Sequence, residues 1–295
     1  MKQTIFTGSG VALVTPFLED NSVNYKKLAE LIEYHIEHRT DALIICGTTG
    51  EAATLSNEEH EQVLKFSVEQ TKGRIPVIAG TGSNDTAYAI QLSQYAQSIG
   101  ADGLLLVTPY YNKASQKGLI AHYTAIANSV TLPIILYNVP SRTGVNITPE
   151  TLNVLADVPN IVAIKEASGD LGLAAKMMQL CGDRIDFYSG NDDIVVPLLS
   201  IGGIGVISVA ANIIPEEVHD MCQLYLDGKV KEAAALQLKY LDLMNTLFCD
   251  VNPIPVKTAM NMLGFEVGPL KLPLCEMTPA NIALLDKSLQ NAGLK

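Results

Sequence analysis

The chain has 295 residues, 48% of them hydrophobic and 17% charged, which is enough to bury one large core or two smaller ones. Its net charge of −11 at pH 7 argues against nucleic acid as a partner. No apolar run approaches the ~18 residues that a transmembrane helix needs, and the N-terminal residues lack a signal-peptide pattern.

The cysteines and histidines form no metal-binding or disulfide pattern. The histidines include no HExxH motif, and there is no CxxC pair among Cys46, Cys181, Cys222, Cys249 and Cys275. Scattered cysteines without a signal peptide are typical of reduced thiols. We therefore expect a cytoplasmic protein with no membrane partner and no metal site.

Apolar strands alternate with amphipathic helices at intervals of roughly 30 residues. Strands are predicted at 10–17, 41–47, 76–82, 103–111, 133–140, 161–168, 185–191 and 203–210. Helices are predicted between them at 25–38, 57–72, 85–99, 116–130, 148–155, 171–181 and 194–200. Eight buried strands alternating with helices favour an α/β fold, a closed (β/α)8 TIM barrel, over an open doubly wound sheet.

After the eighth strand the alternation stops, and further helices are predicted at 215–227, 229–248, 254–263 and 279–292. No low-complexity tract or flexible linker separates them from the barrel. The sequence predicts a catalytic barrel over residues 1–224 and a C-terminal helical domain over residues 225–295 that packs on it.

Lys165 lies in the middle of the apolar strand 161–168. Strand alternation places it on one face with Ala163 and Ala167. The opposite face carries Val162, Ile164 and Glu166. Two small neighbours leave room around an amine stripped of water, which favours its neutral form and its attack on a ketone. The alternative is a lysine at a strand end that reaches solvent or pairs with an acid.

In TIM barrels the chemistry sits at the carboxyl ends of the strands. Hydroxyls, amides and one lysine are predicted there: Thr15, Thr48, Thr49, Tyr110, Tyr111, Tyr137, Asn138, Lys165, Asn191 and Ser208. Acidic pairs and histidines are missing from these strand ends. Such a set suits proton relay around an imine better than metal-assisted hydrolysis or glycoside cleavage.

The segment 47–51, with the sequence GTTGE, follows the second strand. Its glycines, backbone N–H groups and two hydroxyls predict a carboxylate cradle, although a tight turn with hydroxyl caps fits equally well. The segment 80–82, GTG, lacks the third glycine of a dinucleotide-binding loop, so we reject that interpretation.

Tyr137 and Arg142 close the fifth strand, next to the strand of Lys165. A phenol can carry protons, and a guanidinium fork fits a carboxylate. A core tyrosine and a solvated arginine are the commoner roles of these residue types, but adjacent strands place both over one barrel mouth. Tyr110 and Tyr111, at the end of the fourth strand, are typical of an interface.

Over essentially its full length the chain resembles the dihydrodipicolinate synthase family, one of the pyruvate-dependent class I aldolases that also include N-acetylneuraminate lyase. Several spaced motifs carry the resemblance in the correct order: GTTGE at 47–51, TPYYN at 108–112, YNVPSRTG at 137–144, IKEASGD at 164–170 and NPIPVK at 252–257.

The resemblance implies that Lys165 forms a Schiff base with pyruvate and that Tyr137 donates and accepts protons beside it. Thr48 would link Tyr137 to Tyr111 in a hydroxyl relay, with Tyr111 supplied by a neighbouring subunit. The family is commonly a homotetramer, a dimer of dimers. No metal or organic cofactor is implied.

The resemblance also implies the substrate contacts. Thr49 and its N–H would bind the pyruvate carboxylate, and Gly190 and Ile207 would line the pocket. Arg142 would bind the carboxylate of the second substrate. Sialic acid lyases typically lack this arginine and have serine at the second threonine of the cradle, so Arg142 and Thr49 point to a synthase.

The expected activity is that of a lyase of lysine and diaminopimelate biosynthesis. By the resemblance, such an enzyme would condense pyruvate with L-aspartate 4-semialdehyde to give 4-hydroxy-tetrahydrodipicolinate. Two alternatives stay open on the sequence. One is a related pyruvate aldolase acting on a 2-keto-3-deoxy sugar acid or N-acetylneuraminate. The other is a barrel that binds a small acid without turnover, for which a buried amine has little use.

One departure from the family concerns regulation. Lysine-inhibited members carry an acidic residue at an interface cleft, where this chain has Tyr88, and commonly a histidine where it has Asn57. His60, Asn84 and Tyr110 remain. A missing carboxylate opposite an ammonium removes a charge-assisted bond of roughly 1.5–3 kcal/mol, so we expect weak or absent inhibition by lysine.

Overall fold

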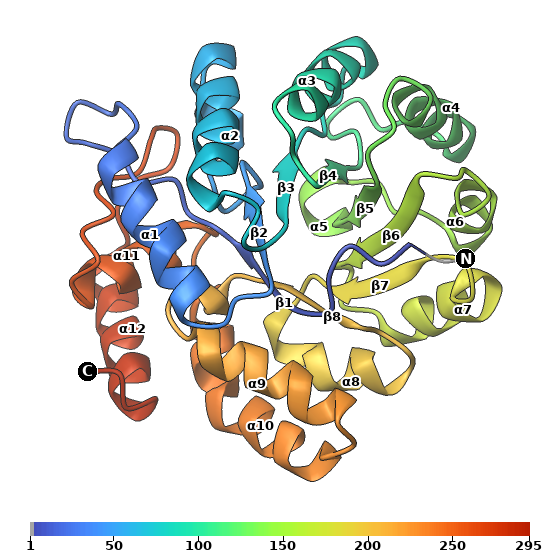
Figure 1. Ribbon diagram of the computed structural model, residues 1–295. Helices are drawn as coiled ribbons and strands as arrows, with labels where there is room; N and C mark the ends of the chain where they lie inside the picture. The colour runs from blue at the N-terminus through green and yellow to red at the C-terminus, as the bar shows by residue number, and fades with distance from the viewer. Residues whose placement is uncertain (1–2) are drawn as a thin grey trace.

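The computed structural model describes residues 3–295, and its eight parallel strands form a closed barrel in chain order, with β8 paired back onto β1 (Figure 1). The strands are β1 Gly8–Ala12, β2 Ala42–Ile45, β3 Val77–Gly80, β4 Gly103–Val107, β5 Ile134–Asn138, β6 Ile161–Glu166, β7 Asp186–Ser189 and β8 Gly205–Ser208. The predicted TIM barrel is confirmed.

Helices surround the strands on the outside of the barrel (Figure 1). They are α1 Tyr25–Glu37, α2 Asn57–Thr71, α3 Thr86–Ser98, α4 Gln116–Ala127, α6 Pro149–Leu155, α7 Leu171–Cys181 and α8 Val195–Ser200. Short turns follow several strands: η1 Ala52–Thr54, α5 Pro140–Thr143, η2 Asp192–Ile194 and η3 Ala210–Asn212. The four short turns, which the sequence pattern did not predict, shape the loops at the barrel mouth.

Side-chain caps fix where the longer helices begin. Ser56 accepts the N–H of Glu59, and the Glu59 carboxylate accepts the N–H of Ser56, which forms a capping box at the start of α2. Side chains also cap the helices that follow Asn24, Asp85, Ser115, Thr148, Asp170 and Thr278. Two of these caps, Asp85 and Asp170, lie within five residues of a strand end, so they help to position the loops of the barrel mouth.

β1 is shorter than predicted and begins earlier, because an amide side chain replaces the sheet ladder after Ala12. Asn212 donates from Nδ2 to the carbonyl oxygen of Ala12 at 2.9 Å and accepts the N–H of Val14 at 3.2 Å. Leu13 still donates to the carbonyl oxygen of Ile44 in β2, but Val14 is bonded to Asn212 and leaves the ladder although it is buried like a strand residue. A hydrophobic run alone does not reveal this exchange.

A register shift in β6 alters the predicted alternation. Ile161 pairs with Ile134 and Ala163 pairs with Ile135, so Val162 is an extra residue and joins the cluster inside the barrel. The prediction that Val162 lies on the face opposite Ala163 was therefore wrong. Beyond the shift the alternation holds, with Ile164 in the outer core.

The chain continues after the barrel with α9 Pro215–Leu226, α10 Val230–Thr246, α11 Ile254–Met262 and α12 Pro279–Asn291. α9 packs against β1 and α10, and α10 packs against η2, α8 and α12 (Figure 1). The expected boundary at residues 224 and 225 falls in the last turn of α9. None of the helices within residues 3–295 combines the length and apolar composition that a bilayer crossing needs.

Candidate active site

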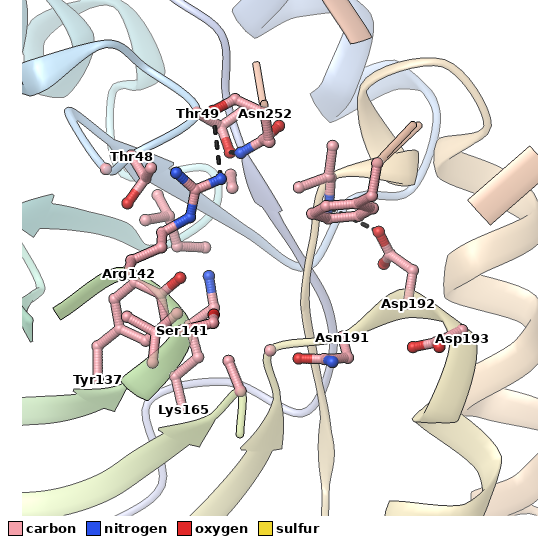
Figure 2. Close-up of a pocket in the computed structure, with 18 of the residues that line it drawn as sticks. Thr48, Thr49, Tyr137, Ser141, Arg142, Lys165, Asn191, Asp192, Asp193 and Asn252 are labelled. Carbon is pink, nitrogen blue, oxygen red and sulfur yellow. Dashed lines mark hydrogen bonds between the residues drawn. The ribbon is translucent and has the colours of Figure 1, made fainter. Parts of the chain in front are cut away.

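A cavity of about 480 Å³ opens at the carboxyl ends of the strands (Figure 2). Six of the eight predicted site residues line it: Thr48, Thr49, Tyr137, Arg142, Lys165 and Gly190. Figure 2 shows Lys165, Tyr137 and Arg142 on one side and Asn191, Asp192 and Asp193 on the other. The cavity therefore brings together residues from β5, β6 and the loops after β2 and β7.

Lys165 is 5% exposed, and its strand register places it directly opposite Tyr137. Burial lowers the pKa of its amine to about 7; Asp192 opposes this shift and Arg142 adds to it. Nζ lies 4.3 Å from the centroid of the Tyr137 ring, and within residues 3–295 it has no hydrogen-bond partner. A large neutral fraction near pH 7 makes this amine a nucleophile.

The phenol of Tyr137 stays protonated at neutral pH. Burial raises its pKa, and Arg142 and a hydrogen bond to Thr48 lower it by less. Tyr137 therefore enters the reaction as a proton donor beside the amine, with the Thr48 hydroxyl as its partner.

The cradle residues 47–51 form a tight loop after β2. Thr15 donates from Oγ1 to the carbonyl oxygen of Gly50 at 2.7 Å, and a Cβ at position 50 would lie 3.1 Å from the carbonyl oxygen of Leu13. Glu51 has φ +54°, in the left-handed region. Close packing thus fixes the loop, with Thr49 2% exposed beneath the cavity.

The rejected dinucleotide motif has a packing role instead. A Cβ at Gly80 would lie 2.2 Å from the carbonyl oxygen of Cys46, and one at Gly82 would lie 2.3 Å from the backbone nitrogen of Val107. These glycines allow neighbouring backbones to approach each other.

Arg142 lies on the single-turn helix α5 and is exposed at the mouth of the cavity. Its Nη2 donates to the main-chain carbonyl oxygen of Asn252 at 3.3 Å. The guanidinium therefore stands at the entrance with most of its donors directed to the cavity and solvent, as a carboxylate receptor requires.

Two predicted site residues do not line the cavity. Tyr111 is 90% exposed with φ +71°, so its ring stands in solvent on the isolated chain. Ile207 is fully buried in the cluster inside the barrel. The predicted roles of Tyr111 and Ile207 in the reaction therefore stay predictions.

Sequence reasoning missed two side chains of the cavity wall. Asp192 is 3% exposed and accepts the N–H groups of Val209 at 3.0 Å and Ala210 at 2.9 Å. Asn252 donates from Nδ2 to Oγ1 of Thr49 at 3.0 Å. Asp192 and Asp193 both line the cavity just after the seventh strand, so the expectation that acidic pairs are missing from the strand ends was wrong. The available signals were the place of Asp192 after this strand and the place of Asn252 in the motif at 252–257.

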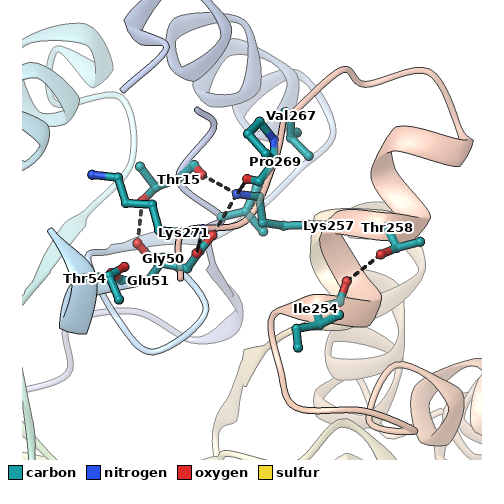
Figure 3. A network of polar contacts seen from close by, with 12 residues as sticks. Thr15, Gly50, Glu51, Thr54, Ile254, Lys257, Thr258, Val267, Pro269 and Lys271 are labelled. Carbon is teal, nitrogen blue, oxygen red and sulfur yellow. Dashed lines mark hydrogen bonds and ion pairs between the residues drawn. The ribbon is translucent and has the colours of Figure 1, made fainter. Parts of the chain in front are cut away.

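Glu51 is the last residue of the cradle. It does not line the cavity and lies in a buried polar network (Figure 3). Its Oε1 lies 2.7 Å from Nζ of Lys257, and its Oε2 accepts the N–H of Lys271 at 3.0 Å. Lys257 also donates to the carbonyl oxygens of Thr15 at 3.2 Å and Pro269 at 2.6 Å. The carboxylate is fully engaged, so it anchors the loop and does not act as an acid or base.

Within residues 3–295, no three or more His, Cys, Asp and Glu side chains are grouped so that they could hold a metal ion. The polar groups of the cavity are an amine, a phenol, hydroxyls, amides, a guanidinium and carboxylates. This set can form an imine with a keto acid, move protons around it and bind carboxylates.

Comparison with known proteins gives one consistent result. The chain matches the model of the Dihydrodipicolinate synthetase family over residues 5–292. A 4-hydroxy-tetrahydrodipicolinate synthase of Clostridium tetani is 62% identical over 292 residues, which cover 99% of each chain. The structure of a chloride-inhibited dihydrodipicolinate synthase from Acinetobacter baumannii complexed with pyruvate is 45% identical, with a TM-score of 0.96, over 99% of this chain and 100% of that one. A structure described as the first monomeric dihydrodipicolinate synthase variant is 40% identical, with a TM-score of 0.96, over 99% and 98% of the two chains.

Proposed function

The chain belongs to the dihydrodipicolinate synthetase family, and we propose that its cavity is where pyruvate condenses with L-aspartate 4-semialdehyde to give 4-hydroxy-tetrahydrodipicolinate. The enzyme is a lyase of the class I aldolase type in lysine and diaminopimelate biosynthesis. The observation that carries the assignment of chemistry to this cavity is the buried amine of Lys165, with a pKa of about 7, beside the phenol of Tyr137.

The first half of the reaction builds a nucleophile from pyruvate. Nζ of Lys165 attacks the ketone carbon, and Tyr137 gives its proton to the oxygen that leaves as water. The Thr48 hydroxyl, which interacts with the phenol, links Tyr137 to Tyr111 in a proton relay. The phenolate of Tyr137 then takes a methyl proton from the resulting iminium, which gives an enamine and restores the phenol. Thr49 holds the pyruvate carboxylate, and Gly190 leaves room because a Cβ there would lie 3.1 Å from Cε of Lys165.

The second half joins the two substrates. The enamine carbon adds to the aldehyde of the semialdehyde, whose carboxylate is bound by Arg142. The amine of the semialdehyde then attacks the imine carbon. The ring closes, and the bond between this carbon and Nζ of Lys165 breaks. Ile207 contributes to the apolar floor of the barrel interior beneath this chemistry.

Borohydride reduction in the presence of pyruvate tests the assignment. The expected product is a single three-carbon adduct on the peptide that contains Lys165, and a Lys165→Ala variant gives none. A label on another lysine, or turnover by the variant at the wild-type rate, excludes the mechanism. A panel of aldehyde acceptors, including sugar aldehydes and N-acetylmannosamine, tests the preference for aspartate semialdehyde.

We also propose that Tyr111 acts in the cavity of a neighbouring subunit, in a homotetramer built as a dimer of dimers. The support is its 90% exposure and its left-handed backbone, which hold the ring away from the cavity of its own chain. Mixing Tyr111→Phe subunits with Lys165→Ala subunits provides the test. If Tyr111 acts in trans, mixed oligomers regain activity that neither variant has alone. If it acts in cis, mixing restores nothing.

Weak or absent lysine inhibition is a further proposal. A second cavity, of about 450 Å³, is lined by Asn57, His60, Tyr88 and Tyr110, and within residues 3–295 no Asp or Glu lines it. Tyr88 donates to Oδ1 of Asn57 at 2.9 Å, and burial lowers the pKa of His60. A lysine ammonium would find no carboxylate there. Sub-millimolar inhibition in a condensation assay would refute the proposal.

A further inference from the structure

The C-terminal helical segment reaches the cradle at two points, 203 and 206 residues away in sequence. Asn252, two residues before α11, donates to Oγ1 of Thr49, and Lys257 on α11 pairs with Glu51 (Figures 2 and 3). Both contacts are made by buried groups: Asn252 is 4% exposed and Lys257 is 1% exposed. The loop that holds the keto-acid carboxylate is therefore bound from outside the barrel.

The hydroxyl of Thr49 has one hydrogen and two lone pairs. Nδ2 of Asn252 occupies a lone pair, and within residues 3–295 this is the only hydrogen bond of Oγ1. The hydrogen is left free for another acceptor. In the opposite orientation of the Asn252 amide, its oxygen would accept the Thr49 hydrogen and its NH2 group would be buried without an acceptor. A buried N–H without an acceptor is rarer in folded proteins than a buried carbonyl oxygen without a donor, so the orientation with Nδ2 on Thr49 is favoured.

We propose that Asn252 is a positioning residue, which directs the Thr49 hydroxyl hydrogen to the pyruvate carboxylate by donating to Oγ1. The proposal deepens the proposed function and rests on it. Oδ1 of Asn252 is buried in the cavity wall and has no hydrogen-bond partner among the described residues, 3–295. Burying this oxygen unpaired costs stability, which the contact of Nδ2 with Thr49 offsets.

The ion pair of Glu51 and Lys257 keeps the two segments in register. Lys271, farther along the chain, donates its N–H to Glu51 and its ammonium to Glu59 at 2.7 Å. The 47–51 loop is thus attached to α2, to α11 and to the segment after α11. Pairing with Lys257 also neutralises a carboxylate that lies two residues from the proposed anion site, where an unpaired charge would repel pyruvate.

A double-mutant cycle between Asn252→Ala and Thr49→Val tests the proposal, with KM for pyruvate as the readout. Asn252→Ala alone is expected to raise this KM about ten-fold, because a hydrogen bond to a charged group is weakened, and to change kcat little. In the Thr49→Val background the same substitution is expected to have no further effect. KM for aspartate semialdehyde stays within two-fold or so, because Arg142 is bound by the main chain of residue 252.

Asn252→Asp provides a second readout. An ionised carboxylate can only accept, so it takes the Thr49 hydrogen and is expected to raise the pyruvate KM more than Asn252→Ala does. Asn245→Ala, on α10 of the same segment, controls for the loss of an amide near the mouth. Its effect, whatever its size, is expected to be the same in both Thr49 backgrounds.

The proposal would be overturned if Asn252→Ala raised the pyruvate KM equally with Thr49 and with Val at position 49. It would also be overturned if KM rose equally for both substrates. Asn252 would then have a structural role only. These results require a wild-type enzyme that condenses the two substrates. If the wild type forms no pyruvate adduct on Lys165, the proposed function fails, and this inference fails with it. If the wild type turns over normally but the effects of Asn252→Ala and Thr49→Val are additive, the role of Asn252 is refuted and the proposed function stands.

Discussion

Two lysines are buried within residues 3–295, and they differ in whether a hydrogen-bond acceptor lies in contact with the amine. Lys257 is 1% exposed and has three acceptors within 3.2 Å, one of them the carboxylate of Glu51. Lys165 is 5% exposed and has an aromatic ring 4.3 Å away, with no acceptor in residues 3–295. Burial lowers the pKa of both amines, but only Lys257 has an opposing carboxylate in contact.

Burial by itself therefore does not make a lysine reactive; burial without an acceptor does. The charged form of Lys257 is compensated by its ion pair, so it ties two segments together. The charged form of Lys165 has no carboxylate in contact, and Asp192 offsets only part of the desolvation, so the neutral nucleophile is populated near pH 7. Four predictions test this difference, from the largest expected effect to the smallest.

Replacing Lys165 by Met is expected to reduce condensation by ~10³-fold or more, because the nucleophile is lost. The free energy of unfolding at pH 7 is expected to rise, because an uncompensated buried amine is replaced by an apolar side chain of similar length. Steady-state assays and urea unfolding measure the two effects. A less stable variant would mean that the amine has a partner that stabilises it.

Replacing Lys257 by Met is expected to lower the free energy of unfolding by about 3–5 kcal/mol, because Glu51 is left buried and unpaired. The double variant Glu51→Gln with Lys257→Met removes both charges and is expected to recover most of that loss. Urea unfolding of the three proteins gives the comparison. If the single and double variants are equally unstable, the ion pair is not the source of the effect.

Of the two buried lysines, the sequence predicted the role of Lys165 but not that of Lys257. The sequence indicated Lys165 because strand alternation gave it two alanine neighbours. Because functional residues of TIM barrels lie at the carboxyl ends of the strands, Tyr137 and Arg142 were expected at the same end of the barrel. The roles of Asn252 and Lys257 depend on partners more than 200 residues away, and no local pattern encodes such pairing.

Local geometry set the other limits of prediction. The register shift at Val162 and the amide of Asn212 that ends β1 arise from single contacts within regular apolar runs. The eight-strand repeat could be predicted because it depends on the whole pattern of hydrophobic residues. Individual site residues could be predicted only from their place in that repeat or from the family resemblance.

The pH dependence of imine formation is expected to follow the Lys165 amine. Its folded-state pKa, about 7, lies below the usual 10.5, so the neutral form is lost as pH falls through about 7. kcat/KM for pyruvate is then expected to fall ~10-fold per pH unit below that point. Stability follows the same sign: between about 7 and 10.5 the unfolded chain binds the additional proton, so the contribution of Lys165 to stability rises with pH. A profile that stays flat down to pH 5 would contradict the lowered pKa.

The smallest expected effect concerns Asp192, the carboxylate that opposes the lowered pKa of Lys165. Asp192→Asn removes the charge, and its amide oxygen can still accept the N–H groups of Val209 and Ala210. The midpoint of the pH profile should therefore move to lower pH, by about one unit or less. Asp193→Asn, which changes the neighbouring carboxylate, is the matched control and should move it less. A midpoint that rises in Asp192→Asn would mean that this carboxylate does not stabilise the ammonium. The reactivity of Lys165 would then depend on desolvation and Arg142 alone.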